Sequence, residues 1–361
     1  MRIKRLGLKN YRNLQNVELK FESMKTLIIG KNAQGKTNIL ESIYLLSDLK
    51  SPRTSTIIDL IQFGEENFEL SAEVEKNNTD IELDFYYDKD KKREFKINKV
   101  KSRAKDFKSI VKTVLFSTKD LLLLRGTPQD RRDWLDRAIS QIYPAYDERL
   151  SKYEKIRIQK SNLLKNEIID ETLYDIYNEQ LIITGANIIF LRKKFLKEIQ
   201  KIAEQKHKII SDTEIFGLKY TCPEDNIESI CEYLKNELLK RRREEFARKQ
   251  ACVGPHRDDI QFTINNLDAT KFASQGQQRT LVLSLKLSEL EIIREKMGYS
   301  PILLLDDVLA ELDEIRQNYL LKSIEKDTQT IITSVDTILF EEEFLKDVKI
   351  YKVDKGEIVW F

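Results

Sequence analysis

An octet near the amino terminus constrains this chain more than any other feature: residues 30–37 read Gly-Lys-Asn-Ala-Gln-Gly-Lys-Thr. It follows the apolar run Thr26–Ile29 and precedes a stretch, Asn38–Leu46, whose pattern predicts a helix. This is the spacing of the G-x-x-x-x-G-K-[ST] phosphate-binding loop in its strand–loop–helix setting. An ordinary glycine turn is the competing interpretation, and the two flanks disfavour it. The octet therefore predicts a nucleoside triphosphate site.

Each residue type in the octet has a physical role. Gly30 and Gly35 let the backbone turn tightly, so that successive N–H groups surround the β-phosphate at the positive end of the following helix. Lys36 is predicted to reach the β- and γ-phosphates, and Thr37 to offer a hydroxyl to Mg²⁺. The remaining loop residues are predicted to contact the phosphates as well: Lys31, Asn32, Ala33 and Gln34.

A second stretch supplies the acids that such a loop needs. The aliphatic run Ile302–Leu305 ends in Asp306 and Asp307, as a buried strand that presents two carboxylates would. Asp306 is predicted to hold the metal through water, and Asp307 to polarise the attacking water as a general base. A solvated acidic pair is the alternative, which the aliphatic run disfavours. Because this pair lies far from Thr37 in the sequence, the nucleotide domain must be split by an insert.

Periodicity indicates what lies between the two halves. Residues 1–21 predict a hairpin interrupted at Asn10–Asn13, and Phe68–Val74 and Ile81–Tyr86 alternate like strands. From about 130 to 250 the pattern turns helical, with breaks expected at Pro144 and Asn166–Glu171. An amphipathic stripe within this region has helical spacing: Ile188, Leu191, Phe195, Ile199 and Ile202.

The expected fold is therefore an α/β nucleotide-binding head split by a mostly helical inserted domain. The predicted boundaries are 1–129 for the amino-terminal lobe, 130–250 for the helical insert and 251–361 for the carboxy-terminal lobe. The final third alternates helix and strand, and Gln329–Thr333 is expected to be a buried parallel strand.

Composition excludes several classes of protein. No apolar run approaches the roughly 20 residues that cross a bilayer, so no membrane partner and a cytoplasmic location are expected. Cys222, Cys231 and Cys252 lack metal-ligand spacing and are expected simply to pack. The net charge is only +2 although 34% of residues are charged, so the distribution of charge matters more than its sum.

Two segments around the acidic strand link the chain to a known class. Ser274-Gln275-Gly276-Gln277-Gln278 precedes that strand and Ala310–Asp313 follows it, which resembles the ABC-type ATPases of the SMC class. Four further stretches make the chain similar to the RecF family within that class: Tyr11–Leu14, Gly126–Arg132, Gly254–Asp259 and Asp306–Asp313. The resemblance runs from about Ile3 to Val335.

This resemblance implies a homodimer controlled by ATP and Mg²⁺. In that class two heads sandwich ATP, each giving its phosphate loop to one nucleotide and its signature segment to the other. The resemblance assigns nucleotide contacts to Arg12, Ser274, Gly276 and Gln277, and places Asp313 across the dimer seam. Independently, a hydroxyl at Ser274 and an unobstructed N–H at Gly276 suit a γ-phosphate clamp at a helix start. An N-cap role for Ser274 is compatible with it.

The function that the resemblance implies is a DNA-binding ATPase switch of recombinational repair, replication and the SOS response. Such a protein dimerises on ATP at gaps or junctions in DNA, binds single- and double-stranded DNA, and helps RecO and RecR load RecA. Any ATPase activity is expected to be weak and stimulated by DNA.

Four departures from the general ABC pattern bear on mechanism. Gln275 stands where the signature has Gly, and Asp307 where the base is usually Glu; its shorter arm predicts slow hydrolysis, a switch rather than a motor. The usual glutamine is missing from Phe116–Asp120. A switch histidine is also missing after Thr333, and the two candidates for its place are Ser334 and Asp336.

The chain's two histidines, His207 and His256, lie elsewhere. His256 is expected to bond to backbone or to Asp258 rather than to act in catalysis.

Two basic clusters are candidate DNA surfaces. Residues 89–112 hold eleven Lys and Arg against three acids, with Phe95 and Phe107 interleaved, and residues 240–249 form the second cluster. Solvated basic faces are the alternative in both cases. No groove-reading helix or aromatic platform is indicated, so binding without base readout and with salt-sensitive affinity is expected.

Two other classes remain as alternatives. The ATP-binding subunit of a membrane transporter shares the loop and signature, but the split head and long insert disfavour it. An ATP-dependent nuclease subunit needs a separate acidic metal cluster, for which only Asp258 and Asp259 are candidates.

Overall fold

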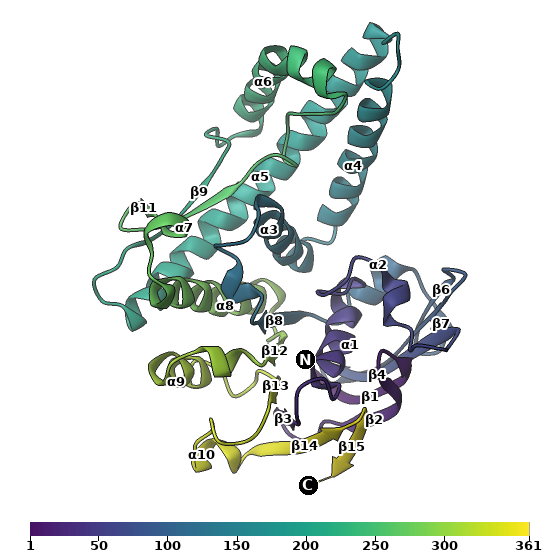
Figure 1. The fold of residues 1–361 in the computed structure, drawn as a ribbon, viewed down its shortest axis with the longest axis vertical. Helices are drawn as coiled ribbons and strands as arrows, with labels where there is room; N and C mark the ends of the chain where they lie inside the picture. The colour runs from purple at the N-terminus through teal and green to yellow at the C-terminus, as the bar shows by residue number, and fades with distance from the viewer. Residues whose placement is uncertain (361) are drawn as a thin grey trace. The chain divides into compact units, whose positions relative to one another are not determined.

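The computed structural model describes residues 1–360, which form two compact units (Figure 1). The first unit joins both ends of the chain, residues 1–121 and those from 286 onward, and the second comprises residues 122–285. The second unit is therefore longer than the predicted insert, 130–250. Residues 251–285 group with it because β10 (Ile260–Ile264) pairs along its length with β9 (Phe216–Tyr220). Strand β9 also shows that residues 130–250, whose pattern predicts helix, are not helical throughout.

A mostly parallel sheet positions the phosphate loop in the first unit. Its strand order is β15-β14-β3-β13-β12-β8, with β15 alone antiparallel to its neighbour. The strands are β3 (Lys25–Ile29), β8 (Thr113–Ser117), β12 (Ile302–Asp306), β13 (Thr330–Ser334), β14 (Val348–Asp354) and β15 (Glu357–Trp360). Register aligns Ile29 with Ser334 and Thr333 with Asp306. The carboxyl ends of the three strands that carry the predicted site therefore meet at one edge.

An antiparallel sheet forms the other layer of this unit, in the order β2-β1-β4-β5-β6-β7. Its strands are β1 (Arg2–Tyr11), β2 (Leu14–Lys20), β4 (Asn67–Lys76), β5 (Thr79–Asp88), β6 (Arg93–Ile97) and β7 (Val100–Lys101). The hairpin predicted for residues 1–21 is confirmed, and the two alternating segments form the paired strands β4 and β5. Asn77 and Asn78, which connect β4 to β5, both have positive φ (51° and 58°), a conformation that Asn tolerates in tight turns.

Helix α1 (Lys36–Asp48) joins the two sheets into one core. Its buried Ile39 and Ile43 belong to the same apolar cluster as Leu8 of the antiparallel sheet and Leu304 of the parallel sheet. The unit also contains the short helical segments η1 (Ile57–Leu60), α2 (Ala104–Lys108), η2 (Asp120–Leu122), η3 (Val308–Glu311), α9 (Glu314–Lys322) and α10 (Glu342–Leu345). Helix α1, which follows the phosphate loop, thus packs against both sheets.

Long helices dominate the second unit. They are α3 (Pro128–Ile142), α4 (Tyr146–Leu163), α5 (Glu171–Ile210) and α6 (Ile227–Arg248), with the short α7 (Ala269–Phe272) and the two-residue strand β11 (Leu267–Asp268). Helix α8 (Gln275–Met297) begins in this unit and ends in the first. The predicted breaks at Pro144 and 166–171 fall between α3 and α4 and between α4 and α5. Within residues 1–360, no helix is both long and apolar enough to span a bilayer.

His256 is a half-buried structural residue of the second unit. Its Nε2 lies 3.1 Å from the Ala251 carbonyl oxygen and its Nδ1 lies 2.6 Å from the Tyr153 hydroxyl. Since a carbonyl can only accept, Nε2 carries the hydrogen and Tyr153 donates to Nδ1. The expected bond to backbone is confirmed, whereas Asp258 contacts Tyr220 instead (2.8 Å). Burial lowers the pKa of His256 to about 4.

This depressed pKa predicts a loss of stability in mild acid. The unfolded chain protonates His256 below about pH 6.5, but the folded chain only below about 4, so stability falls as pH drops through that window. Between pH 7.5 and 4.5 the contribution is about 2.5 kcal/mol. His256→Gln offers an amide N–H and an amide oxygen in place of the two ring nitrogens, and it does not titrate. Urea unfolding at both pH values should therefore show that the free energy of unfolding falls less between pH 7.5 and 4.5 in His256→Gln than in the wild type. Equal falls in the two proteins would contradict the depressed pKa of His256.

Candidate nucleotide-binding site

The phosphate loop connects β3 to α1 through a strained backbone. Ala33 and Gly35 both have positive φ, 64° and 121°. A Cβ at Gly35 would lie 2.8 Å from Leu14 Cδ2, and one at Gly30 would lie 2.4 Å from the carbonyl oxygen of Val353. Glycine is thus required at Gly30 by a backbone atom of a neighbouring strand and at Gly35 by its backbone conformation. The strand–loop–helix setting expected from the octet is present.

Lys36 directs its amine back into the loop. Nζ donates to the carbonyl oxygens of Gly30 (2.8 Å) and Lys31 (3.2 Å), and the side chain is only 3% exposed. It also lies 4.0 Å from the Asp307 carboxylate. A nearly buried cation at the start of a helix makes this loop a strongly anion-attracting cradle.

Thr37 and Asp306, far apart in sequence, meet at the edge of the parallel sheet. Asp306 Oδ1 accepts from the hydroxyls of Thr37 and Thr333, each at 2.9 Å. Burial raises the pKa of Asp306, and the neighbouring Asp307 acts in the same direction. A partly desolvated carboxylate beside a hydroxyl is an oxygen donor set that suits Mg²⁺, with phosphate and water completing the shell. The residues present therefore fit the metal predicted from the sequence.

Asp307 follows the strand in a left-handed conformation, with φ of 50°. Its N–H donates to the Thr333 hydroxyl (2.9 Å), and its carboxylate remains 35% exposed. It borders a pocket of about 430 Å³ that is also lined by Asn32 of the loop. Asp307 is thus the accessible acid of the pair, in keeping with the predicted general base.

The same pocket is lined by residues at the positions where this chain lacks the usual glutamine and the usual switch histidine of ABC-type ATPases. Thr118 lines it from the segment that lacks a glutamine, and both candidates for the switch position, Ser334 and Asp336, line it from the end of β13. Because both residues line the pocket, either Ser334 or Asp336 can take the place of the switch histidine. Its wall also includes Val335 and Ile338, which are 51% and 85% exposed.

Arg12 is engaged by a buried carboxylate. Its guanidinium makes a bidentate pair with Glu41 (2.9 and 3.0 Å) and donates to the carbonyl oxygen of Asp59 (2.9 Å). Arg53 lies 3.7 Å from the same Glu41, which is fully buried. The resemblance assigns Arg12 to the nucleotide; the structure places it in this network, and its nucleotide contact stays a prediction.

Sequence reasoning missed Asn13, which fastens the loop from the β1–β2 turn. Its Nδ2 donates to the carbonyl oxygen of Gln34 (3.1 Å), while its Oδ1 accepts from Asn38 Nδ2 (2.7 Å). The Asn-flanked hairpin turn was visible in the sequence, but only the fold brings it to the loop.

The signature segment lies in the second unit, at the start of α8. Ser274 and Gln277 form a reciprocal capping box: the Gln277 N–H donates to Ser274 Oγ (3.2 Å) and the Ser274 N–H to Gln277 Oε1 (2.7 Å). Gln277 Nε2 donates to Glu214 (2.8 Å), whose other oxygen lies 2.9 Å from His207 Nε2. Glu214 and His207 were not predicted to act here. Ser274 itself is exposed.

Asp313 and the Gly254–Asp259 string have structural contacts as well. Asp313 caps α9 by accepting from the Arg316 N–H (3.0 Å). Asp259 forms a bidentate pair with Arg131 (2.7 and 2.9 Å), and burial raises the pKa of Asp258. Asp258 and Asp259 are thus tied to Tyr and Arg side chains, an arrangement different from an open acidic metal cluster.

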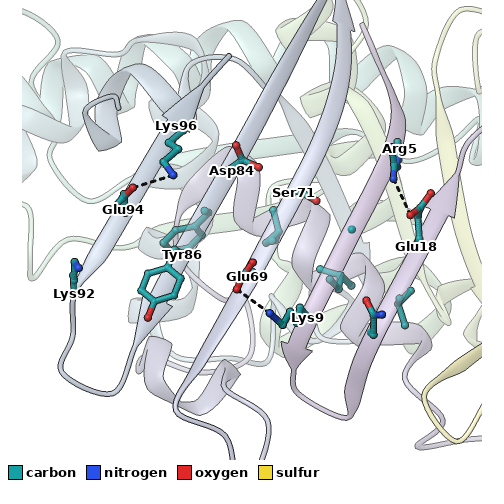
Figure 2. Close-up of a pocket in the computed structure, with 16 residues that line it drawn as sticks. Arg5, Lys9, Glu18, Glu69, Ser71, Asp84, Tyr86, Lys92, Glu94 and Lys96 are labelled. Carbon is teal, nitrogen blue, oxygen red and sulfur yellow. Dashed lines mark hydrogen bonds and ion pairs between the residues drawn. The ribbon is translucent and has the colours of Figure 1, made fainter. Parts of the chain in front are cut away.

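The first basic cluster is partly neutralised by acids, which pair with at least five of its eleven basic residues. Its ion pairs, at 2.7–3.7 Å, are Lys89–Glu66, Lys96–Glu94, Lys99–Glu82, Arg103–Asp106 and Lys108–Asp48. Figure 2 shows Lys96 paired with Glu94 in a hollow of about 630 Å³ on the face of the antiparallel sheet, where Lys9–Glu69 and Arg5–Glu18 pair too. Phe95 and Phe107 are buried and pack with Phe85 in the core, so they do not flank a DNA surface.

The second basic cluster is balanced in the same way. Helix α6 pairs Lys240 and Arg241 with Glu237, Arg248 with Glu244, and Arg242 with Glu171. Pairing lowers the net field that either cluster offers to a phosphate backbone. A contact of either cluster with DNA stays a prediction.

Comparison with known proteins agrees with this fold and site. The family model of the RecF/RecN/SMC N terminal domain matches residues 2–359. The DNA replication and repair protein RecF of Bacillus cereus (strain G9842) is 40% identical over 369 positions, covering 99% of this chain and 98% of that protein. The protein of the same name from Streptococcus gordonii is 41% identical over 363 positions, covering 99% of this chain and 100% of that one.

Solved structures give the same result. A structure of the recombination mediator protein RecF-ATPrS in the RecFOR pathway matches with a TM-score of 0.91 and 34% identity, covering 99% of this chain and 97% of that one. An SMC head bound to the C-winged helix domain of ScpA matches at a TM-score of 0.58 and 15% identity, over 99% of this chain and 97% of that one, a likeness of fold alone. These matches confirm the predicted α/β ABC-type head with an inserted, mostly helical domain.

Proposed function

The chain belongs to the RecF family, and from this premise we propose that it is an ATP-dependent DNA-binding protein of recombinational repair and replication. The observation that carries the proposal is the meeting of Lys36, Thr37, Asp306 and Asp307 at one sheet edge. Relatives named as DNA replication and repair proteins, and a structure named RecF-ATP, support it.

ATP binding is proposed to use the loop from Gly30 to Thr37. Lys36 would hold the β- and γ-phosphates, and Thr37 with Asp306 would hold Mg²⁺, which neutralises charge on the phosphates when bound. Asp307 would accept the proton of the attacking water. Because its arm is one methylene shorter than that of Glu, hydrolysis is proposed to be slow.

Dimerisation is proposed to complete this site. Ser274 is exposed at the start of α8, and within residues 1–360 its hydroxyl accepts only the local Gln277 N–H, so it retains capacity toward a phosphate of a second copy. ATP would then join two copies on gapped DNA, where the protein helps RecO and RecR load RecA. The RecFOR pathway named for the related structure supports the partners in general terms. A cytoplasmic location and a place in the SOS response stay predictions.

The mass of the wild-type protein in solution tests this proposal directly. Light scattering is expected to show a shift from monomer to dimer when ATP, Mg²⁺ and a gapped duplex are added together. No shift would contradict the switch, and cut strands would favour the nuclease alternative.

DNA affinity is expected to fall steeply with salt. For about four phosphate contacts, raising salt from 50 to 200 mM should weaken binding about 100-fold, with a linear plot of log affinity against log salt. Among residues 1–360 no ion pair is found for Lys92 or Arg243, so Lys92→Glu and Arg243→Glu each test one cluster. The variant in the contacting cluster should lose about one unit of slope. An affinity independent of salt would contradict electrostatic binding.

A further inference from the structure

The turn between β14 and β15, near the end of the chain, contacts the phosphate loop. The Gly356 N–H donates to the backbone carbonyl of Gln34 (3.0 Å), and the Lys355 N–H donates to the Gln34 side-chain oxygen (2.5 Å). Gln34 is separated from Lys355 and Gly356 by more than 300 positions in the sequence. One loop residue is therefore held through both its backbone and its side chain.

The approach is closer than any side chain would allow. Gly356 has a φ of 82°, and a Cβ there would lie 2.2 Å from the carbonyl oxygen of Asn13. On the other side of the loop, a Cβ at Gly30 would lie 2.4 Å from the carbonyl oxygen of Val353, in β14. Contacts this short cannot be relieved by rotating a flexible side chain, because the opposing atoms belong to the backbone.

Strand register explains why the turn arrives at this place. β14 runs parallel to β3 with Lys352 opposite Ile29, and it continues to Asp354, so the phosphate loop and the turn follow their strands at the same end of the sheet. The carbonyl of Gln34 also accepts from Asn13 Nδ2 in the β1–β2 turn (3.1 Å). Hairpin turns from the two different sheets thus converge on the same carbonyl.

We propose that the β14–β15 turn is a latch that pre-shapes the phosphate loop, with Gly356 as a positioning residue for ATP binding. The inference rests on the proposed function, in which this loop binds ATP. A loop whose N–H groups are already aimed loses less conformational entropy when phosphate binds, and affinity rises accordingly. Gly356 acts through Gln34 and Asn13.

Gly356→Ala, compared with Gly298→Ala, tests the latch. Both glycines have positive φ, 82° and 74°, but a Cβ at Gly298 meets no atom within 4 Å. The two variants thus carry similar backbone strain, and only Gly356→Ala displaces the turn from Asn13. ATP affinity, measured by titration calorimetry, is expected to fall about tenfold or more in Gly356→Ala and less than twofold in Gly298→Ala. Equal affinities in the two variants would overturn the latch.

A second measurement uses the wild-type protein and does not depend on the variant's folding. If the latch favours ATP, linkage requires that ATP favours the latch. Hydrogen exchange at the Lys355 and Gly356 amides is expected to slow when ATP binds, while the Asn77–Asn78 turn exchanges unchanged. ATP binding without slower exchange at 355 and 356 would overturn the inference alone. A wild-type protein that does not bind ATP would overturn the proposed function as well.

Discussion

Replacing Lys36 with Met is expected to weaken ATP binding at least 100-fold and to remove ATP-driven dimerisation. The amine is the cation at the centre of the loop, where Nζ already bonds to two loop carbonyls. Hydrogen bonds between charged partners contribute about 1.5–3 kcal/mol each, and two phosphate contacts would account for a 100-fold change. Titration calorimetry with ATP and Mg²⁺ measures the affinity, and light scattering measures the dimer.

Lys31→Met is the matched control for that variant. It removes the same charge from the same loop, but the side chain of Lys31 is exposed and only its carbonyl contributes to the Lys36 contacts. The expected loss of affinity is less than about fivefold, the size of a screened surface charge effect. If Lys31→Met and Lys36→Met weakened ATP equally, the role assigned to Lys36 would be wrong and general charge would explain both.

The residues of the nucleotide site were predictable because they belong to short sequence motifs. The octet and the aliphatic run before Asp306 each carry a strand, a turn and reactive side chains within a few residues. Their meeting followed from a general property: parallel strands bring their carboxyl ends to one edge, where ligand sites form. The hydrogen bond from Thr37 to Asp306 is the observed form of that prediction.

Contacts that depend on register between distant segments were not predictable in this way. Nothing near Gln34 in the sequence indicates that Gly356 will meet it, since β14 had first to pair with β3. The link from Gln277 through Glu214 to His207 likewise depends on how α5 ends.

The acidic partners of the first basic cluster were not predictable for a related reason. The sequence displays the basic residues of 89–112 together, but their acidic partners Glu66, Glu82 and Asp48 come from other elements. Phe95 and Phe107 were grouped with them by proximity in sequence, although strand alternation and the short helix α2 turn both rings into the core. The charge of a protein surface depends on all the elements that form it, so a run of basic residues in the sequence predicts it poorly.

Ser274→Arg distinguishes ATP binding by the phosphate loop of one copy from dimerisation through the signature segment of the second copy. The variant is expected to bind ATP within about threefold of wild type as a monomer, because the phosphate loop is untouched, yet to show no ATP-driven dimer. Ser274 is exposed at a helix start, where an arginine would place a large cation against the second copy's loop lysine and lose the hydroxyl. A buried like-charge contact of this kind costs several kcal/mol, enough to abolish association.

Asn226→Arg is the control that removes the purely structural explanation. Asn226 is another exposed N-cap of the second unit, accepting from the Ser229 N–H (2.8 Å) just as Ser274 accepts from the Gln277 N–H. Both substitutions lose a cap worth about 1 kcal/mol, so the thermal stabilities of the two variants should match. Only Ser274→Arg should lose the dimer under ATP, Mg²⁺ and gapped duplex. A Ser274→Arg protein that dimerises like wild type would show that the signature segment does not clamp the nucleotide of a second copy, even if Lys36 binds ATP as expected.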